Sequence, residues 1–294
     1  MNKRALVIVN PNAGMKKAKK NLFEIVDQLS RHGYKVSTQT TTKAGDGTAI
    51  AKELSAKQDL IVCCGGDGTL NEVINGILEA GCKTPIGYVP AGTTNDFART
   101  LMLPKKAEKC MELIHSGWPR PCDIGSFNGR NFTYIASLGA FTKVSYSTPQ
   151  KIKNVLGHTA YVLEGAKEIS TLSPFSASFT TDGETYEGEF LFGCISNSTS
   201  IGGLFRLNRL DVRLDDGEFE LLLVRNPKNV TDVNGLIQGL VRGQYDPRHV
   251  VFTHTNDITF HSDTPLPWTL DGESGGNHSD VHISVLPDAI NIIF

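Results

Sequence analysis

The sequence predicts an α/β first half followed by a β-rich second half. Before residue 120, a short apolar stretch followed by a turn and a helical stripe occurs four times, which is typical of a doubly wound, mostly parallel sheet with helices on both faces. After residue 122, alternating apolar and polar residues and turn dipeptides such as Asp182-Gly183 prevail, which indicates an antiparallel β-sandwich. A chain of 294 residues exceeds the usual single core, so we expect two domains, residues 1–122 and 123–294.

The formal net charge of −2 is unevenly distributed along the chain. Residues 1–120 contain 17 Lys and Arg against 11 Asp and Glu, whereas residues 121–294 contain 12 against 20. A cationic first half suits a polyphosphate ligand or an anionic lipid surface. Because no long basic run is interleaved with aromatic residues, we expect no nucleic-acid partner.

The sequence predicts neither a membrane span nor secretion. No apolar run approaches the ~20 residues that a span needs, and the apolar stretch near the start is too short for a signal peptide. We therefore expect a cytoplasmic protein whose contact with the inner membrane surface is peripheral. The six cysteines form no C-x-x-C pair and the eight histidines lack metal-ligand spacing, so we expect reduced thiols and no zinc site.

The first strand is predicted at residues 5–9, followed by the turn Asn10-Pro11-Asn12-Ala13-Gly14 and a helix. On the residues alone, this turn is either an ordinary strand end or an anion-binding helix N-terminus. Four lysines stand at the start of the helix: Lys16, Lys17, Lys19 and Lys20. They form either a solvated face or a contact for lipid headgroups.

The next predicted elements are a strand at residues 34–40, a turn that begins at Thr41 and a helix at residues 48–55. A strand at residues 60–64 then leads into Gly65-Gly66-Asp67-Gly68 and a helix with apolar residues at positions 70, 73, 74 and 77. Glycines here let a ligand approach the bare backbone, and the helix N-terminus favours an anion. A bare Asp67 carboxylate among these donors would repel phosphate. It makes sense if a divalent cation lies between the two, or if Asp67 acts on a proton or a hydroxyl. Glycines that serve only tight packing are the alternative.

A strand at residues 86–89 precedes the stretch Pro90-Ala91-Gly92-Thr93-Thr94-Asn95-Asp96-Phe97-Ala98-Arg99 and a helix around residues 107–114. Thr93 and Asn95 can donate to phosphate, whereas Asp96 is equally suited to cap a helix. Since the carboxyl ends of parallel strands share one edge of a sheet, we expect the three loops to lie together there.

The second half is predicted to be mostly strands, at residues 175–181, 190–195, 219–224, 250–253 and 281–285. Helical stripes occur near residues 153–169 and 233–240. The last residues, 289–294, suit a strand in either domain. Two acidic turns stand out, Arg213-Leu214-Asp215-Asp216-Gly217-Glu218-Phe219 and Trp268-Thr269-Leu270-Asp271-Gly272-Glu273. The first of them also fits a plain Asp-Gly hairpin turn.

Together these motifs resemble the diacylglycerol kinase family, which includes sphingosine kinases and related bacterial lipid kinases. Gly-Gly-Asp-Gly-Thr alone is also similar to NAD kinases and phosphofructokinases. Its extension through Asn75-Gly76, the Asn-Pro turn, Pro-x-Gly-Thr-x-Asn-Asp and Asp-Gly-Glu are similar to the lipid kinases. The resemblance covers nearly the whole chain, with four motifs in order, and implies an NAD kinase-like or phosphofructokinase-like first domain.

The resemblance implies that ATP binds to the loops of the first domain. The implied nucleotide-binding residues are Asn10, Pro11, Asn12, Ala13, Gly14, Thr41, Gly66, Asp67, Gly68, Thr69, Leu70, Asn71, Glu72 and Thr93. It also implies a structural Mg²⁺ held by Asp216 and by the backbone carbonyls of Arg213 and Glu218, with Asp215 as a flanking alternative and Asp123 as a link to the cleft. Glu273 is implied to be the general base that takes the proton from the acceptor hydroxyl, across a cleft between the domains.

The implied activity is transfer of the γ-phosphate of ATP to diacylglycerol. A sphingoid base or a phosphatidylglycerol-like lipid is an alternative acceptor, and an NAD kinase or a nucleotide-binding regulatory module are further alternatives. Intact Asp67, Asp216 and Glu273 argue against the regulatory module. One segment, Ile201-Gly202-Gly203-Leu204-Phe205-Arg206-Leu207-Asn208, departs from the family's Gly-Gly-Gly and Ala-Pro pattern and leaves the acceptor open. A homodimer is also left open.

Overall fold

The protein is described by a computed structural model that covers residues 3–139, 173–201, 205–206, 212–242 and 245–294. The chain folds as two compact units. The first consists of residues 1–124, 214–217 and 286–294, and the second of residues 125–213 and 218–285. The chain therefore crosses between the units four times, and its last segment returns to the first unit.

The first unit is built on a parallel sheet with the strand order β15-β4-β3-β1-β2. The strands are β1 (Lys3–Val9), β2 (Tyr34–Thr40), β3 (Leu60–Gly65), β4 (Ile86–Pro90) and the end of β15 (Glu273–Ile293). Ile292 of β15 lies opposite Ile86, so the final residues close this sheet. β3 and β4 are buried along their whole length, which explains their continuous apolar sequence.

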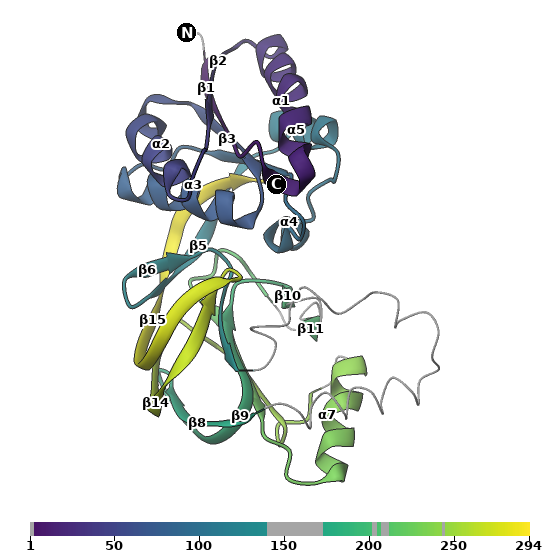
Figure 1. Ribbon diagram of the computed structural model, residues 1–294, viewed down its shortest axis with the longest axis vertical. Helices are drawn as coiled ribbons and strands as arrows, with labels where there is room; N and C mark the ends of the chain where they lie inside the picture. The colour runs from purple at the N-terminus through teal and green to yellow at the C-terminus, as the bar shows by residue number, and fades with distance from the viewer. Residues whose placement is uncertain (1–2, 140–172, 202–204, 207–211, 243–244) are drawn as a thin grey trace. The chain divides into compact units, whose positions relative to one another are not determined.

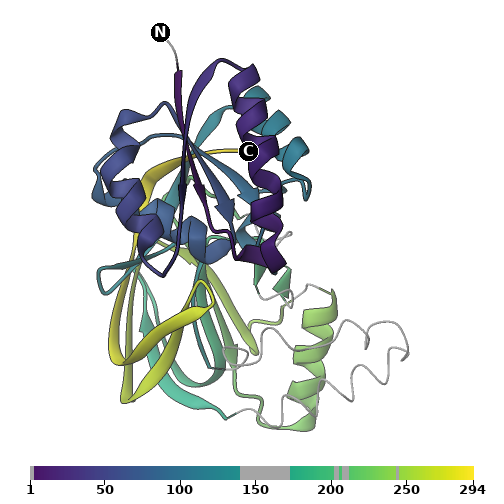
Figure 2. The ribbon, with the colours of Figure 1, turned by 45° about the horizontal axis from the view of Figure 1, so that its top comes forward.

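Helices connect the parallel strands. They are α1 (Ala13–Arg31), α2 (Asp46–Leu54), the 3-10 helix η1 (Ser55–Lys57), α3 (Asp67–Glu79), α4 (Asp96–Thr100) and α5 (Ala107–Ser116). Figures 1 and 2 show α1 beside α5 on one side of the strands and α2 beside α3 on the other. Ala18, Ile25 and Leu29 of α1 pack into the core with Val7 and Val62 of the sheet, as the apolar stripe of α1 requires.

The second unit is an antiparallel β structure with the strand order β13-β12-β9-β7-β14-β15, in which β8 pairs with both β14 and β9, and β6 pairs with β5. Its strands include the end of β5 (Pro119–Phe127), which begins in the first unit, and the start of β15. Between these two in the sequence come β6 (Arg130–Phe132), β7 (Ile135–Gly139), β8 (Phe175–Thr180), β9 (Thr185–Ser196), β12 (Phe219–Arg225), β13 (Val250–Thr255) and β14 (Asp257–Leu270). β10 (Ser200–Ile201) and β11 (Phe205–Arg206) form a separate pair, and α7 (Val230–Arg242) is the helix described in this unit. The chain is thus an α/β protein with an antiparallel β domain after it.

An aromatic core fills the second unit. Phe179, Phe260 and Trp268 are buried, and the Phe260 ring lies 5.1 Å from those of both Phe179 and Trp268 in edge-to-face contacts. Such contacts add to the stabilisation from apolar burial. Phe179 and Phe260 lie opposite each other on β8 and β14, so the alternation seen in the sequence delivers these rings to the same face of the sheet.

Several predicted boundaries differ from the structure. The segment with Pro119 and Pro121, just before the expected domain boundary at residue 122, is the exposed start of β5, a position in a strand at which proline is tolerated. β14 was not predicted, because prolines and a shift of register between His261 and Leu266 interrupt its alternation. The helix expected at residues 153–169 lies outside the described residues, while the one expected at 233–240 is α7.

Two expectations on composition can be compared with the structure. All six cysteines are free thiols, as expected, and burial raises the pKa of Cys64 to about 12 and that of Cys110 to about 11. Among the described residues, no helix has the length and apolar character to cross a bilayer.

Two histidines stack where α1 and α5 end. The rings of His32 and His115 lie 3.5 Å apart between centroids and 14° from parallel. Nε2 of His115 is buried and lacks a hydrogen-bond partner among the described residues. Burial, and then the neighbouring His32, lower the pKa of His115 to about 4. Both effects disfavour the charged imidazole, so His115 is neutral at pH 7.

This pair predicts an acid-sensitive contribution to stability. An unfolded histidine binds a proton below pH ~6.5, whereas folded His115 resists it down to about pH 4. The free energy of unfolding should therefore be highest above pH 6.5 and fall as the pH drops towards 4. Chemical denaturation followed by circular dichroism at pH 7.5 and pH 5 should show a smaller drop for His115→Gln than for the parent. An equal drop in both proteins would contradict this account.

Candidate active site

Three loops of the first unit meet through bare backbone. They follow β1, β3 and β4, and each carries one glycine at the meeting point: Gly14, Gly66 and Gly92. Gly14 has a φ of 51°, and a Cβ there would collide with the Ala91 carbonyl oxygen. A Cβ on Gly92 would lie 2.6 Å from the Gly66 Cα. These glycines are therefore needed for the approach of backbone to backbone, and the expected convergence of the three loops is present.

Hydrogen bonds fix the loops to one another. The Asn10 N–H donates to the Cys64 carbonyl (3.0 Å), and the Ala91 N–H donates to the Gly65 carbonyl (2.7 Å). The Asn10 amide donates to the Thr69 hydroxyl (3.3 Å), while its oxygen accepts from the Asn12 N–H (3.0 Å). Asn10 thus ties the turn before α1 to the first turn of α3, a connection that the sequence did not reveal.

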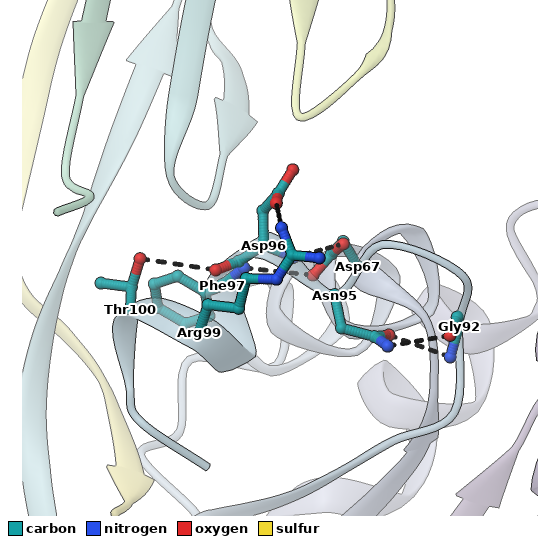
Figure 3. A network of polar contacts seen from close by, with 7 residues as sticks. All are labelled: Asp67, Gly92, Asn95, Asp96, Phe97, Arg99 and Thr100. Atoms are coloured by element: carbon teal, nitrogen blue, oxygen red, sulfur yellow. Dashed lines mark hydrogen bonds and ion pairs between the residues drawn. The ribbon is translucent and has the colours of Figure 1, made fainter. Parts of the chain in front are cut away.

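Asp67 holds the start of α4 (Figure 3). Its carboxylate accepts hydrogen bonds from the backbone N–H groups of Asp96 (3.0 Å) and Phe97 (3.3 Å). The question that the sequence raised, what an acid does among anion-binding donors, has a local answer here: Asp67 caps a neighbouring helix. The Asp96 carboxylate pairs with Arg99 at 3.0 Å, and burial raises the pKa of Asp96 while Arg99 opposes that rise.

Asn95 closes its own loop instead of pointing to a ligand (Figure 3). Its side-chain oxygen accepts from the Gly92 N–H (2.9 Å), and its amide donates to the Gly92 carbonyl (2.8 Å). The residue has a φ of 52°, which asparagine tolerates better than most residues. Thr93, between these partners, is exposed. Asn95 is therefore a rigid clip, and Thr93 is the loop side chain that solvent or a ligand reaches.

Glu72 caps α2. Its two carboxylate oxygens accept from the N–H groups of Gly45 (2.8 Å) and Gly47 (2.9 Å), and its carbonyl accepts from the Thr48 hydroxyl (3.1 Å). Thr41, at the start of the same turn, is buried. The resemblance implied nucleotide contact for both residues, and the structure places both where they set the turn before α2.

The remaining residues of the two signature turns lie at the N-termini of α1 and α3. Pro11, Asn12 and Ala13 lead into α1, and Gly68 and Thr69 form the first turn of α3 with Asp67. Leu70 is buried, and Asn71 receives the Asn75 amide at its carbonyl (2.9 Å) and its side-chain oxygen (3.0 Å). The first N–H groups of a helix have no partner within that helix. Two such termini beside bare glycine backbone make this face suited to binding phosphate.

Asp123 anchors the acidic turn near residue 216. Its carboxylate accepts from the N–H groups of Gly217 and Asp288, each at 2.7 Å, and its own N–H donates to the Leu214 carbonyl at 2.8 Å. The side chain is fully buried. Burial raises the pKa of Asp123, the Asp288 and Asp216 carboxylates add to the rise, and the two N–H groups oppose it.

This turn offers oxygen ligands suited to a hard cation. Asp215 and Asp216 are exposed beside the buried Asp123, so carboxylate charge is concentrated here. Within the part of the chain that the structure describes, no three His, Cys, Asp or Glu side chains form a metal-binding group. A cation at this turn would take backbone carbonyls or waters in addition to carboxylate ligands, and Mg²⁺ accepts both. The turn does not join a hairpin, since the strand after it, β12, pairs with β9 and β13.

In the second unit, Asp271 fixes the hairpin between β14 and β15. Its carboxylate accepts from the N–H groups of Thr133 (2.6 Å), Tyr134 (3.0 Å) and Ile135 (3.1 Å). Asp271 is buried at a φ of 50°, followed by Gly272 at 86°, as a two-residue turn requires. Burial raises the pKa of Asp271, and the three backbone donors oppose it. Sequence reasoning did not single out this residue, although it belongs to the Asp-Gly-Glu motif.

Glu273 is the first residue of β15 and is exposed at the tip of this hairpin. It lies opposite Leu270, and the neighbouring Ser274 carbonyl accepts from the Arg130 guanidinium at 2.9 Å. The tip is thus held on both sides of Glu273, by Asp271 and by Arg130. The carboxylate itself is presented to solvent on a rigid support.

A buried polar row crosses the second unit and was missed from the sequence. Glu220 on β12 lies opposite Ser196 of β9 and His254 of β13. Glu220 and Ser196 are buried, as are Asn197 and Ser198. The sequence did contain one signal for this row, the charged Glu220 inside the apolar run Phe219–Val224. Buried hydroxyl, amide and carboxylate groups at one level of a sheet require hydrogen-bond partners to offset the loss of water.

The segment whose sequence departs from the lipid-kinase pattern, residues 201–208, is described only at 201 and 205–206. The rest of it lies outside the described residues. Ile201 lies opposite Phe205 in the β10–β11 pair.

Comparison with known proteins matches both parts of the chain. Residues 4–127 match the diacylglycerol kinase catalytic domain, and residues 136–294 match the YegS C-terminal NAD kinase beta sandwich-like domain. A diacylglycerol kinase of Bacillus subtilis is 36% identical over 277 residues, covering 93% of this chain and 91% of that protein. One of Staphylococcus carnosus is 35% identical over 279 residues, covering 94% and 90%. A crystal structure of a diacylglycerol kinase from Bacillus anthracis has the same fold, with a TM-score of 0.76 at 24% identity over 100% of this chain and 97% of that one.

The three backbone hydrogen bonds of Asp271 predict that a single substitution, Asp271→Asn, lowers stability markedly. Asp271→Asn replaces one acceptor oxygen by an NH₂ group that faces backbone donors, which should lower the free energy of unfolding of the second unit by about 1–3 kcal/mol. Fluorescence of buried Trp268, in a Trp118→Phe background, reports denaturation of this unit. Asp263→Asn, at an exposed position of β14, is the matched control and should cost under about 0.5 kcal/mol. Equal losses in the two variants would contradict the role of Asp271.

Proposed function

The chain belongs to the diacylglycerol kinase catalytic-domain family, and on this premise we propose that it transfers the γ-phosphate of ATP to the hydroxyl of diacylglycerol to give phosphatidic acid. The observation that carries the proposal is the meeting of three glycine loops at the N-termini of α1 and α3. Such an arrangement binds a polyphosphate by backbone N–H groups. The family relation supplies the lipid acceptor.

In this proposal, ATP binds along the turns at residues 10–14 and 66–72, with Thr41 and Thr93. The absence of a Cβ at Gly14 and Gly66 lets the loops meet, and Gly68 offers bare backbone to the phosphates. Asp67 and Glu72 position the loops, because their carboxylates hold the starts of α4 and α2. The ordered loops then need little rearrangement when the triphosphate binds, which favours catalysis by positioning.

Glu273 is the proposed general base. Phosphoryl transfer needs an alcohol in line with the γ-phosphate and a group to take its proton, with little covalent chemistry from the protein. An exposed carboxylate on a hairpin held by Asp271 and Arg130 can reach a bound hydroxyl without losing its support. The proton of the acceptor hydroxyl passes to Glu273 as the new P–O bond forms, while the bond between the γ-phosphorus and the bridging oxygen breaks and ADP leaves.

The acidic turn fits the proposed Mg²⁺ site. Asp216 would hold the ion with its carboxylate, and Arg213 and Glu218 with their backbone carbonyls. The concentration of carboxylate charge near buried Asp123 supports a cation there. Bound at this place, Mg²⁺ would neutralise that charge and stabilise the turn. A second Mg²⁺ accompanies ATP as part of the substrate.

Phosphorylation of another lipid alcohol is the alternative that the acceptor segment leaves open. A test is a panel of acceptors incubated with ATP labelled in the γ-phosphate: diacylglycerol, a sphingoid base, phosphatidylglycerol and NAD. We expect diacylglycerol to be the best acceptor and NAD to be inactive. Phosphorylation of NAD alone, or of none of the four, would overturn the proposal.

Replacing the base should stop transfer but not binding. Glu273→Gln keeps the size of the side chain and removes its basicity, so kcat should fall about 100-fold or more, while the Kd for ATP stays within a factor of two. Asp263→Asn, exposed on the neighbouring strand β14, should retain the parent kcat. A kcat for Glu273→Gln near that of the parent would remove Glu273 from the mechanism.

The metal site can be tested without turnover. Millimolar Mg²⁺ should raise the melting temperature of the parent, because a ligand that binds only the folded state stabilises it. The rise should vanish in Asp216→Ala and persist in Asp215→Ala, its exposed neighbour. The measurement is thermal unfolding with Mg²⁺ and with EDTA. An unchanged response in Asp216→Ala would count against this site.

A further inference from the structure

Helix α4 ends in a capping motif that normally contains glycine. The Leu103 N–H donates to the Ala98 carbonyl (2.8 Å), and the Met102 N–H donates to the Arg99 carbonyl (3.0 Å). These two bonds define a Schellman motif, in which the residue after the cap takes the left-handed conformation. That residue is Met102, with a φ of 53°. Glycine is favoured there because any Cβ is strained in this conformation.

Met102 is unusual in two ways at once. In the described part of the chain, the other non-glycine residues with positive φ are all Asn or Asp, which tolerate it. Met102 is also 87% exposed, so its thioether side chain gains nothing from burial. A long apolar residue that strains the backbone and stands in water does not serve the fold. Outliers of this kind point to a function outside it.

Basic residues flank Met102 on two segments. The Lys17 ammonium donates to the Lys105 carbonyl at 3.2 Å, which joins the start of α1 to the loop after α4. Residues 13–23 and 97–107 together contain seven Lys and Arg and no Asp or Glu. Lys20 lies on the same side of α1 as Lys17, three residues further on. We call Met102 with Lys17, Lys20, Lys105 and Lys106 the Met102 surface; all five residues are exposed.

We propose that the Met102 surface docks the protein on an anionic lipid bilayer, with Met102 inserted among the acyl chains and the lysines on the headgroups. The inference rests on the proposed function in one respect, that a lipid acceptor brings the protein to a bilayer. An apolar tip within a basic rim is the pattern of a peripheral membrane contact.

The charges select the bilayer over other partners. A second copy of this chain that docked through the same face would present the same lysines and be repelled. Burial of one Met side chain strengthens partition roughly tenfold, and each lysine near an anionic surface strengthens it about fivefold. A weak insertion combined with several ionic contacts gives reversible binding that depends on salt and on anionic lipid.

The decisive variant is Met102→Gly, because its effects on stability and on docking have opposite signs. Glycine relieves the left-handed strain, so the melting temperature should stay equal or rise by about 2–4 °C. Vesicle partition should fall about tenfold. The assay is co-sedimentation of the full chain, without ATP, with phosphatidylcholine vesicles that contain phosphatidylglycerol as a quarter of the lipid or lack it.

Trp118→Gly is the matched control. Trp118 is 80% exposed but follows the far end of α5, which begins just after Lys106, about 15 Å away along the helix. The Trp118→Gly variant should bind the vesicles as tightly as the parent does. Lys105→Glu with Lys106→Glu should abolish the preference for phosphatidylglycerol.

The proposal is overturned if Met102→Gly binds vesicles like the parent, if Trp118→Gly loses as much binding, or if the parent binds no vesicles and instead forms oligomers or binds an acidic protein. Phosphorylation of dispersed short-chain diacylglycerol is measured in parallel, because it needs no docking on a bilayer. Activity on this substrate without vesicle binding would overturn the docking proposal alone, whereas its absence would count against the proposed function.

Discussion

The first unit depends on the close approach of three backbone loops, which only glycine allows. Gly14 lies against Ala91, and Gly66 lies against Gly92, at distances where a Cβ has no room. Because of these contacts, the N-termini of α1 and α3 share one face with the loop after β4. Any side chain at these positions would separate the loops, and the N–H groups would no longer converge on one ligand.

The acids of the motifs divide into those that hold backbone and those that are presented to solvent. Asp67, Glu72, Asp123 and Asp271 each accept two or more backbone N–H groups, and each thereby fixes a helix start or a turn. Asp216 and Glu273 are exposed. Asp216 precedes Gly217, whose N–H donates to Asp123, and Glu273 follows Asp271 by two residues. A carboxylate saturated with backbone donors is well suited to rigidity and poorly suited to exchange a ligand or a proton. The proposed chemistry therefore lies on the exposed acids, and the buried ones supply their orientation.

The exposure and backbone strain of Met102 bear on the proposed membrane contact of the first unit. The glycine loops require small residues to bring chain segments together, whereas Met102 occupies a position where a small residue would suit the fold better. The uneven charge of the sequence is concentrated near it, in segments without acids. The basic half of the chain thus offers both a phosphate-binding face and a basic, apolar-tipped surface.

The sequence by itself determined the alternation of strands and helices in the first unit, the glycine turns after β3 and β4 and the turn before α1, because apolar periodicity and glycine positions are local properties of the chain. It also carried the family, through motifs whose order is preserved. Only the tertiary structure decided that Asp67 and Glu72 cap helices and that Asp271 holds a hairpin turn. It also decided that residues 286–294 return to the first sheet and that β14 forms despite its prolines. The physical reason is that a carboxylate's role depends on which backbone donors reach it, and those donors lie 25 to 138 residues away along the chain.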